Sequence, residues 1–335
     1  MFCRRKQYVT INEIAKRANV SRTTVSRVIN GTGYVRDELK KRVLQVIEET
    51  GYIPSENAKS LRTKKTNIIG VILPKISTET SSRLMNGIDQ VLAPKGYQIL
   101  LTITNQEPAK EIDFLHLLKG RNVDGIILSA THIDEALREE IKKLKMPFVM
   151  VGQEMEGTAG VVLDDFQATY DLVKLFIERG HKEIGFIGVT EEDRAVGYLR
   201  KLGYLKALKD NGLEIKHHWI QEGNFDAASG FHATENMAEE GELPSAIIAV
   251  TDRLAIGAMQ YAKGQGLSIP NQLAIAGMGA SEISTYIEPQ LTTVDFSQVD
   301  AGVEAAGILL EQLSGQKTDT VTVKNNYRIL VRESI

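Results

Sequence analysis

The residues with the clearest chemical potential lie near the N-terminus, in the segment SRTTVSR at residues 21–27. Arg22 and Arg27 can each donate paired hydrogen bonds to a guanine edge, and Thr23 offers a methyl or a hydroxyl group. If the segment is helical, these side chains and Ser26 occupy the N-terminal half of the helix. That arrangement is typical of a helix that reads base edges in the major groove, so the expected chemistry is hydrogen bonding to DNA.

We find no residue pattern typical of catalysis. A Walker loop is absent, and GMGASE at residues 277–282 lacks the third glycine of a dinucleotide-binding turn. There is no G-x-S-x-G elbow and no H-x-x-x-H pair. Cys3 is the only cysteine, which excludes a cysteine zinc site and fits a reducing cytoplasm. We therefore expect no enzyme, no metal and no other cofactor.

Two short helices joined by a tight turn are needed to present the segment, and the sequence predicts them. Thr10 is a suitable N-cap, with Glu13 at capping-box spacing, and Ser21 can cap the second helix. A third helix is predicted over residues 37–50, ended by Gly51. The alternative is a three-helix bundle without a ligand, which leaves the basic surface of the second helix unexplained.

Charge is divided unevenly along the 335 residues, whose net charge is −3. Residues 1–65 contain 15 Lys and Arg against 6 Asp and Glu, whereas the other 270 residues contain 25 against 37. A small basic segment before a large acidic one indicates a polyanionic partner for the first alone. The alternative is a solvated charged face without a partner. No apolar run approaches the ~18 residues of a membrane span and no signal peptide is visible, so we expect a cytoplasmic protein without membrane contact.

The acidic remainder alternates short β-rich runs with amphipathic helical stretches, which predicts parallel sheets flanked by helices. Two series of strands indicate two similar subdomains with a cleft between them; the runs are 68–73, 97–103, 124–130 and 147–152, then 184–189, 246–250 and 273–277. Ligands of such folds bind beyond the carboxyl ends of strands. Polar residues near these ends are candidates, first Arg200 and Asp252, and more weakly Ser77, Arg83, Thr131 and His132. Asp252 has capping of the helix that follows it as its alternative role, and the two roles can coexist.

Five segments carry more specific information: VTINEIAKRANVSRTTVSRVING from residue 9, GYIPSENAKSLRTKKTNIIGVILP from residue 51, VVLDDFQATYDLVKLFIERGHKEIGFIG, TDRLAIGAM and PQLTTVDF. Together they resemble the lactose-repressor (LacI/GalR) family of bacterial transcription regulators, over the whole chain. The resemblance implies an N-terminal all-α helix-turn-helix head. It also implies an α/β periplasmic-binding-protein-like core of two doubly wound parallel-sheet subdomains.

The resemblance also implies domain boundaries, with three crossings of the chain between the subdomains. We expect a head at 1–54, a hinge at 55–65 and a core at 66–335. The first subdomain would span about 66–163 and 293–326, and the second about 164–292 and 327–335.

In relatives the hinge folds on specific DNA as a dimer, and a leucine enters the central minor-groove step. Leu61 holds that position here and Ala58 faces the partner; the alternative for Leu61 is packing on the core. The candidate DNA-binding residues are Thr10, Ser21, Arg22, Thr23, Thr24, Ser26, Arg27, Asn30, Tyr52, Asn57, Ala58, Lys59 and Leu61.

For the effector, the resemblance points to residues of the cleft. The candidate effector-binding residues are Thr131, Gln167, Arg200, Phe225, Thr251, Asp252 and Gly279. Thr131 is the weaker candidate among them. Phe225 has core packing as its alternative. Relatives usually carry an acidic residue where Gly279 stands, so one hydroxyl contact is lost or is supplied elsewhere, for example by Glu282. Sequences with this glycine resemble repressors of sucrose and related oligosaccharide genes.

These observations predict a repressor that binds a pseudo-palindromic operator in double-stranded DNA as a homodimer and responds to a small sugar or sugar phosphate. One alternative is a sugar-binding sensor without operator recognition. Another is a catabolite-control-type regulator that answers to a protein co-effector. An unusually basic patch on the first subdomain would favour it, but the stretch SSRLMNGIDQ at residues 81–90 contributes only Arg83.

Overall fold

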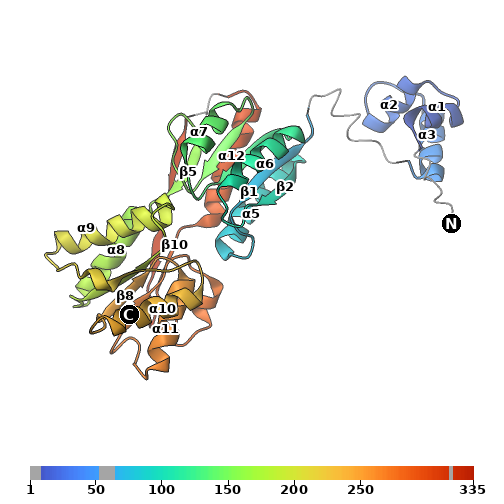
Figure 1. Ribbon diagram of the computed structural model, residues 1–335. Helices are drawn as coiled ribbons and strands as arrows, with labels where there is room; N and C mark the ends of the chain where they lie inside the picture. The colour runs from blue at the N-terminus through green and yellow to red at the C-terminus, as the bar shows by residue number, and fades with distance from the viewer. Residues whose placement is uncertain (1–8, 53–64, 317–319) are drawn as a thin grey trace, which may run out of the picture. The chain divides into compact units, whose positions relative to one another are not determined.

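The computed structural model describes residues 9–52, 65–316 and 320–335, and the chain forms two compact units (Figure 1). The first unit is residues 1–66 and the second is residues 67–335. Four of the predicted DNA-binding residues lie outside the described residues, namely Asn57, Ala58, Lys59 and Leu61.

The first unit contains the three helices that the sequence predicts, α1 (Ile11–Arg17), α2 (Arg22–Asn30) and α3 (Asp37–Thr50). The Thr10 side chain accepts a hydrogen bond from the N–H of Glu13, and Ser21 caps α2 in the same way. Gly51 ends α3 with a left-handed backbone, φ 60°. The local signals at helix ends therefore fix where each helix begins and stops.

A small apolar core holds the three helices together, made of Ile14, Ala15, Ala18, Val25, Val43 and Val46. Helices of 7 and 9 residues are too short to be stable alone in water, so this packing keeps α1 and α2 folded. Because Val25 is the buried residue of α2, the opposite, polar face of that helix stays exposed.

The first half of the second unit is built on a six-stranded parallel sheet in the order β11-β5-β4-β3-β1-β2. Its strands are β1 (Ile68–Leu73), β2 (Gln98–Ile103), β3 (Gly125–Ser129), β4 (Phe148–Val151), β5 (Gly160–Leu163) and β11 (Thr322–Asn325). Its helices are α5 (Glu79–Leu92), α6 (Ala109–Gly120), α7 (Glu135–Lys142) and α12 (Gln298–Leu313), with a 3₁₀ turn at Ala93–Lys95. In Figure 1 the red β11 lies beside the green β5, although the two are far apart in the sequence.

The second half has a four-stranded parallel sheet in the order β7-β6-β8-β9 and a two-stranded antiparallel sheet of β10 and β12. These strands are β6 (Ile184–Gly188), β7 (Ile220–Glu222), β8 (Ala246–Ala249), β9 (Ala274–Ala276), β10 (Thr293–Asp295) and β12 (Arg328–Leu330). The helices are α8 (Asp165–Glu178), α9 (Arg200–Asp210), α10 (Ala227–Glu239) and α11 (Asp252–Gly264). A π-helical segment, Arg194–Leu199, runs directly into α9, and 3₁₀ turns cover His217–Trp219 and Glu282–Thr285.

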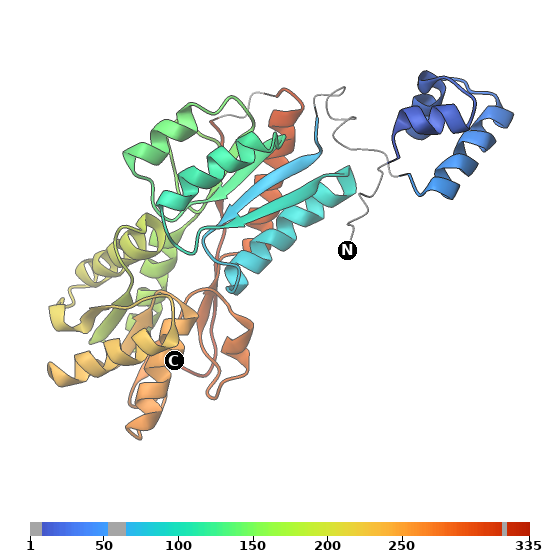
Figure 2. The same ribbon diagram turned by 45° about the vertical axis from the view of Figure 1, so that its right-hand side comes forward.

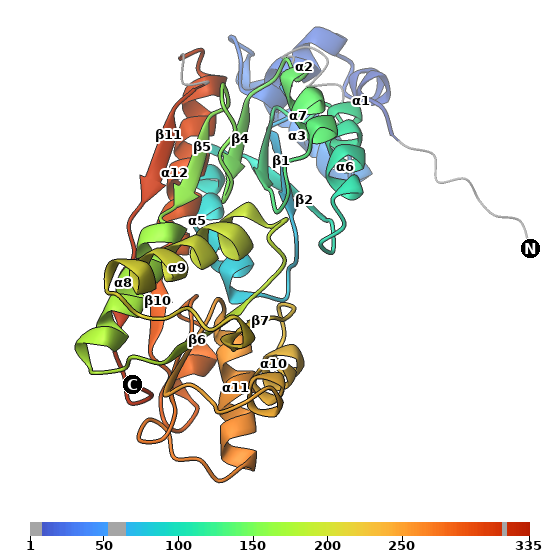
Figure 3. The ribbon, with the colours of Figure 1, turned by 60° about the vertical axis from the view of Figure 1, so that its left-hand side comes forward.

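The chain passes between the two halves of the second unit three times. Figure 3 shows these two halves one above the other. The first passage follows β5, the second joins β10 to α12, and the third joins β11 to β12. Loops at the carboxyl ends of both parallel sheets therefore meet at the junction of the halves.

Both faces of the first sheet are covered, which explains the continuous apolar runs in its strands. In β1, Ile69, Val71 and Leu73 pack in one cluster, whereas Ile72 belongs to the cluster on the other face. This split follows from the alternation of side chains along a strand. In the second half a single cluster surrounds β6, β8 and β9.

Two glycines let α5 and α12 pack with their backbones in direct contact, and Figure 2 shows the two helices side by side. A Cβ atom on Gly87 would lie 2.0 Å from the carbonyl oxygen of Val299. One on Gly302 would lie 2.2 Å from the carbonyl oxygen of Leu84. No side chain can be added at either position without separating the helices.

The fold class expected from the sequence is confirmed, and so are the seven strands predicted from β-rich runs, each within one or two residues at its ends. The sequence did not predict β5, β7, β10, β11 and β12. Four of them, β7, β10, β11 and β12, contain polar or charged residues, so no continuous apolar run marks them. Partners distant in the sequence hold β5, β10, β11 and β12 in place. Throughout the described ranges, the helices are too short or too polar to cross a bilayer.

Candidate functional site

The exposed face of α2 carries the cations and hydroxyl groups predicted to contact DNA. Arg22, Thr23 and Arg27 are exposed, while Ser26 is half-buried. The N-terminal end of a helix also presents free N–H groups, which favour phosphate. This face can therefore reach base edges through arginine and contact the backbone through the helix end.

Other predicted residues of the head are engaged within it. The Ser21 hydroxyl hydrogen-bonds to the Thr24 hydroxyl at 2.9 Å as well as capping α2. The Asn30 amide donates to the carbonyl oxygen of Ser26 at 2.6 Å. Thr10 caps α1, and Tyr52 packs against the apolar core. These residues fix the shape of the recognition face, whatever else they contact.

A cavity of about 670 Å³ lies between the two halves of the second unit. Its wall contains six of the seven candidate effector residues, Thr131, Arg200, Phe225, Thr251, Asp252 and Gly279. Phe225 also packs against the core of the second half, so its two expected roles coexist. The wall is formed from both halves, so a molecule in the cavity touches both.

Gln167 is not among the residues that line the cavity. Its side-chain amide donates to Asp171, one turn further along α8, at 2.9 Å. Asp165 lines the cavity instead. Successive helical residues are ~100° apart, so positions 165 and 167 lie on nearly opposite sides of α8. The sequence signal for Asp165 is the pair Asp164–Asp165, which sequence reasoning did not use. Asp164 caps α8, and Asp165 lines the cavity.

Arg200 and Asp165 form an ion pair in the wall. Nε and Nη2 of Arg200 lie 2.8 and 2.7 Å from Oδ1 of Asp165, and Nη1 donates to the carbonyl oxygen of Val250. Cζ of Arg200 lies 4.6 Å from the centre of the Phe296 ring. Burial raises the pKa of Asp165, and the attraction of Arg200 opposes that rise. The guanidinium is thus held in one orientation within the cavity wall.

Asp193 is a second carboxylate of the wall that sequence reasoning missed. It caps the π-helical segment by accepting from the N–H of Val196 at 3.0 Å. The amide of Gln153, from the first half, also donates to it at 3.2 Å. Burial raises its pKa. Its position in the run EED gave no sign of which acid would turn inward.

Asp252 is buried at the start of α11, but it does not cap that helix. Thr251 is the N-cap and accepts from the N–H of Leu254, so the capping alternative for Asp252 is wrong. Asp252 accepts from the hydroxyl of Thr293 and from the N–H of Ser281. Burial raises the pKa of Asp252.

Gly279 adopts φ 132°, a backbone conformation that side chains disfavour, and faces Asp252. Glu282, suggested as a substitute for the missing carboxylate, is not among the lining residues. Its carboxylate accepts from the Tyr286 hydroxyl, and its N–H donates to Glu79.

Glu111 lies behind Thr131 and is 1% exposed. The N–H and hydroxyl of Thr131 each approach Oε1 at 3.4 Å, while Oε2 is buried and has no hydrogen-bond partner among the described residues. Burial raises the pKa of Glu111 to about 7. This carboxyl group supports the wall from within and is half protonated near neutral pH.

The three weaker candidates besides Thr131 connect the halves rather than line the cavity. The carbonyl oxygen of Ser77 accepts from Arg253 at 2.7 Å, and the ring of His132 lies 3.0 Å from the carbonyl oxygen of Glu192. Nη1 of Arg83 donates to the carbonyl oxygen of Gly279 at 3.5 Å, while Nη2 pairs with Glu79 within α5 at 3.2 Å. These contacts hold the two halves in the arrangement described here.

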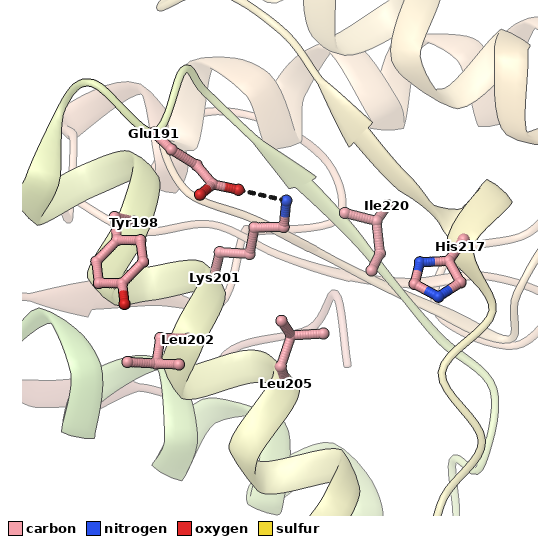
Figure 4. A pocket seen from close by; sticks show the side chains of 7 residues that line it. All are labelled: Glu191, Tyr198, Lys201, Leu202, Leu205, His217 and Ile220. Carbon is pink, nitrogen blue, oxygen red and sulfur yellow. Dashed lines mark hydrogen bonds and ion pairs between the residues drawn. The ribbon is translucent and has the colours of Figure 1, made fainter.

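A second cavity of about 390 Å³ lies on the second half, away from the junction (Figure 4). Its wall is mostly apolar, with Leu202, Leu205 and Ile220, and its lysine, Lys201, pairs with Glu191 at 2.6 Å. Within residues 9–52, 65–316 and 320–335, no group of side chains is arranged to hold a metal ion.

Two family models match the chain: "Bacterial regulatory proteins, lacI family" over residues 10–55 and "Periplasmic binding protein-like domain" over residues 173–335. Catabolite control protein A of Priestia megaterium is 37% identical, over 97% of this chain and 99% of its own length. The solved transcriptional regulator CelR–cellobiose complex is 25% identical, with a TM-score of 0.75 over 98% of this chain and 100% of that one. The lac repressor dimer bound to operator and the anti-inducer ONPF has the same fold, with 24% identity and a TM-score of 0.88 over 98% and 99%.

Proposed function

As a member of the lacI family of bacterial regulatory proteins, this chain is a DNA-binding transcriptional regulator, and we propose that it represses carbohydrate-utilisation genes as a homodimer whose operator affinity is set by a small sugar. It is not an enzyme. A regulator that binds chromosomal DNA works in the cytoplasm of a bacterium, which is where we place it.

The observation that carries the proposal is the combination of an arginine-bearing recognition face on α2 with a polar cavity that both core halves enclose. Aspartate, arginine and aromatic side chains in one wall suit a sugar, because carboxylates and guanidinium groups bind hydroxyls in pairs and rings stack on sugar faces. Two related proteins of this fold are described with cellobiose and with the anti-inducer ONPF. By similarity, we propose that this chain also binds a small sugar-like effector.

Coupling between the two sites requires that the effector bind one arrangement of the halves better than the other. Groups of the first half, such as Thr131, and groups of the second, such as Arg200, both border the cavity. A ligand that engages both changes the preferred angle between the halves. We propose that this change reaches the head through the segment 55–65, acting as a hinge in which Leu61 contacts the minor groove. The coupling free energy would be ~1–3 kcal/mol. By reciprocity, bound operator must lower the affinity for the sugar by the same factor as the sugar lowers the affinity for the operator.

Two parts of this proposal come from related proteins. The dimer and the operator follow the lac repressor dimer bound to operator, and a pseudo-palindromic site follows from the two-fold symmetry of a dimer.

The catabolite-control-type alternative needs a basic patch on the first half for a protein co-effector. Arg83 is the one cation of residues 81–90 and is paired with Glu79, which does not favour that alternative.

The test is operator selection from random duplexes by the purified chain, followed by anisotropy titrations with and without sugars. We expect a pseudo-palindrome with a flexible pyrimidine–purine step at its centre, released by one sugar. A palindrome that no sugar affects would contradict the effector part and favour a protein co-regulator. Failure to enrich any sequence would contradict operator recognition.

A further inference from the structure

The buried charges of the central cavity are mostly negative. Four charged side chains of its wall are less than a tenth exposed: Asp165 at 2%, Asp193 at 9%, Asp252 at 3% and Arg200 at 5%. Three carboxylates thus accompany one guanidinium group. Moreover, Arg200 is already paired with Asp165 through two of its nitrogens.

The remaining cations of the wall lie nearer to solvent and have their own partners. Arg253 is exposed and donates to the carbonyl oxygen of Ser77 at 2.7 Å. Lys75 is half-buried; the pKa of Asp226 is lowered first by hydrogen bonds from Ser229 and to a lesser extent by the charge of Lys75. Glu79 is the further acid of this outer part of the wall. The outer part is therefore balanced in charge, and the negative excess belongs to the buried part.

This distribution disfavours an anionic ligand. A phosphate or carboxylate in the cavity would lose hydration and would face Asp193 and Asp252 at short range, where charges interact more strongly than in water. The buried cation that could compensate is committed to Asp165, and sharing it would weaken that pair. The wall therefore lacks the unpaired arginines that bind phosphate in pairs of hydrogen bonds.

The same wall suits hydrogen-bond donors. The Val196 N–H and the Gln153 amide bind Oδ1 of Asp193, and the N–H of Ala195 also hydrogen-bonds to that carboxylate. A carboxylate has about four acceptor sites, so one remains for a ligand. Arg200 binds Asp165 only at Oδ1. Hydroxyl groups and ammonium groups can donate to these oxygens, and charge-assisted hydrogen bonds of this kind are the stronger ones. The rings of Phe225 and Phe296 offer apolar faces in the same cavity.

We infer that the central cavity binds an uncharged or amine-bearing polyol and rejects phosphorylated and carboxylated sugars. The inference rests on the proposed function, since it names the chemical class of the effector of that site. Of the two effectors expected from the sequence, a sugar or a sugar phosphate, the inference retains the sugar and excludes the sugar phosphate.

The experiment compares matched ligands on the full-length protein by calorimetry at constant ionic strength and pH 7.5. Each set contains a sugar, its 6-phosphate and, where they exist, its amine and its uronate. The monosaccharide sets derive from glucose, galactose, mannose and fructose, and the disaccharide sets from sucrose, maltose, cellobiose and trehalose.

We expect the tightest ligand to be an uncharged or amine-bearing member, and its phosphate ester to bind at least about tenfold more weakly, which corresponds to ~1.4 kcal/mol. A phosphate or uronate that binds more tightly than its parent would overturn the inference, and so would the absence of binding by every uncharged and amine-bearing member. Operator binding by the same sample is measured separately. Its loss would overturn the proposed function and leave the ligand class standing.

Two acids of one loop provide a matched pair of variants. Asp193 borders the central cavity, whereas Glu191 borders the second cavity, where Figure 4 shows its ion pair with Lys201. For the tightest ligand, Asp193→Asn should weaken binding about tenfold through loss of a charged acceptor, and it should also narrow the gap to the phosphate ester. Glu191→Gln should change neither the affinity for the tightest ligand nor the difference in affinity between that ligand and its phosphate ester. Equal effects of the two variants, or an unchanged gap in Asp193→Asn, would contradict the inference. If Asp193→Asn does not fold, Asp252→Asn tests the same narrowing.

Discussion

The side-chain amide of Gln153, which follows β4 in the first half, donates a 3.2 Å hydrogen bond to Oδ1 of Asp193 in the second half. Gln153 also donates to the carbonyl oxygen of Thr131, so it joins two loops of its own half to the other half. All three residues line the central cavity. A ligand there must keep this bond or replace it, which gives the ligand a direct influence on how the halves are joined.

The first prediction concerns recognition by α2. Arg27→Ala should raise the operator dissociation constant about 5- to 150-fold, ~1–3 kcal/mol, because an exposed arginine in the recognition face is lost. Anisotropy titrations over a range of salt concentrations measure the effect. Arg121→Ala, an exposed arginine of the second unit, is the control and should leave affinity and salt dependence unchanged. Equal behaviour of the two variants would remove Arg27 from the interface.

A second prediction separates the effector site from the operator site. Asp252→Asn should leave operator affinity without sugar unchanged, while weakening the response to the sugar, because the substitution removes a buried charge from the cavity wall alone. The measurement is the sugar concentration needed for half-release of the operator. A normal response would exclude Asp252 from the site.

The buried ion pair gives a third prediction. Arg200→Met should lower the free energy of unfolding by about 3–5 kcal/mol, because Asp165 would be left buried without its partner. Replacing both, as Asp165→Leu with Arg200→Met, should recover a large part of that loss. Urea denaturation of the two single variants and the double variant measures the coupling. Additive losses would show that the pair does not act as a unit.

The fourth prediction is a pH dependence that originates in Glu111. Burial raises its pKa from 4.5 to about 7, so the folded protein holds a proton that the unfolded chain releases. Its contribution is complete below pH 4.5 and is lost as pH rises through 7, up to about 3 kcal/mol.

Glu111→Gln should remove that part of the pH dependence, so its stability should fall less between pH 5 and 8 than that of the unsubstituted protein. Denaturation midpoints across this range test the prediction. Glu107→Gln, on an exposed acid paired with Lys110, should retain the original profile. Parallel profiles for Glu111→Gln and the unsubstituted protein would show that Glu111 titrates normally.

A fifth prediction tests the contact of α5 with α12. Gly302→Ala should destabilise the core by several kcal/mol, because its methyl group would overlap the backbone of α5. Gly307→Ala is in the same helix with open space around it and should stabilise by up to ~1 kcal/mol, since alanine favours a helix. Thermal melts distinguish the two, and equal shifts would refute the close approach.

The sequence by itself determined features that depend on neighbours along the chain. Thr10 and Ser21 placed the starts of α1 and α2 because a cap acts within three residues. Strands such as β1 were readable because both of their faces are buried, which leaves a continuous apolar run. Arg200 and Asp252 were predicted from their places after strands and again from the resemblance to a known family, and both line the cavity.

Only the tertiary structure decided which polar groups share the cavity wall. Asp165 lines the cavity and Gln167 does not, because the two residues lie on different sides of α8. Which side of α8 faces the cavity is set by the packing of that helix on the core rather than by residue type. Asp193 and Glu111 have ordinary local sequences, and their surroundings come from segments tens of residues away. The three buried carboxylates of the wall, Asp165, Asp193 and Asp252, all belong to the second half, where they stand at the starts of α8, the π-helical segment and α11. The first half closes the cavity over them and supplies Gln153 as a partner of Asp193. The negative charge of the site is therefore gathered by the packing of segments far apart in the sequence, which no single stretch of sequence contains.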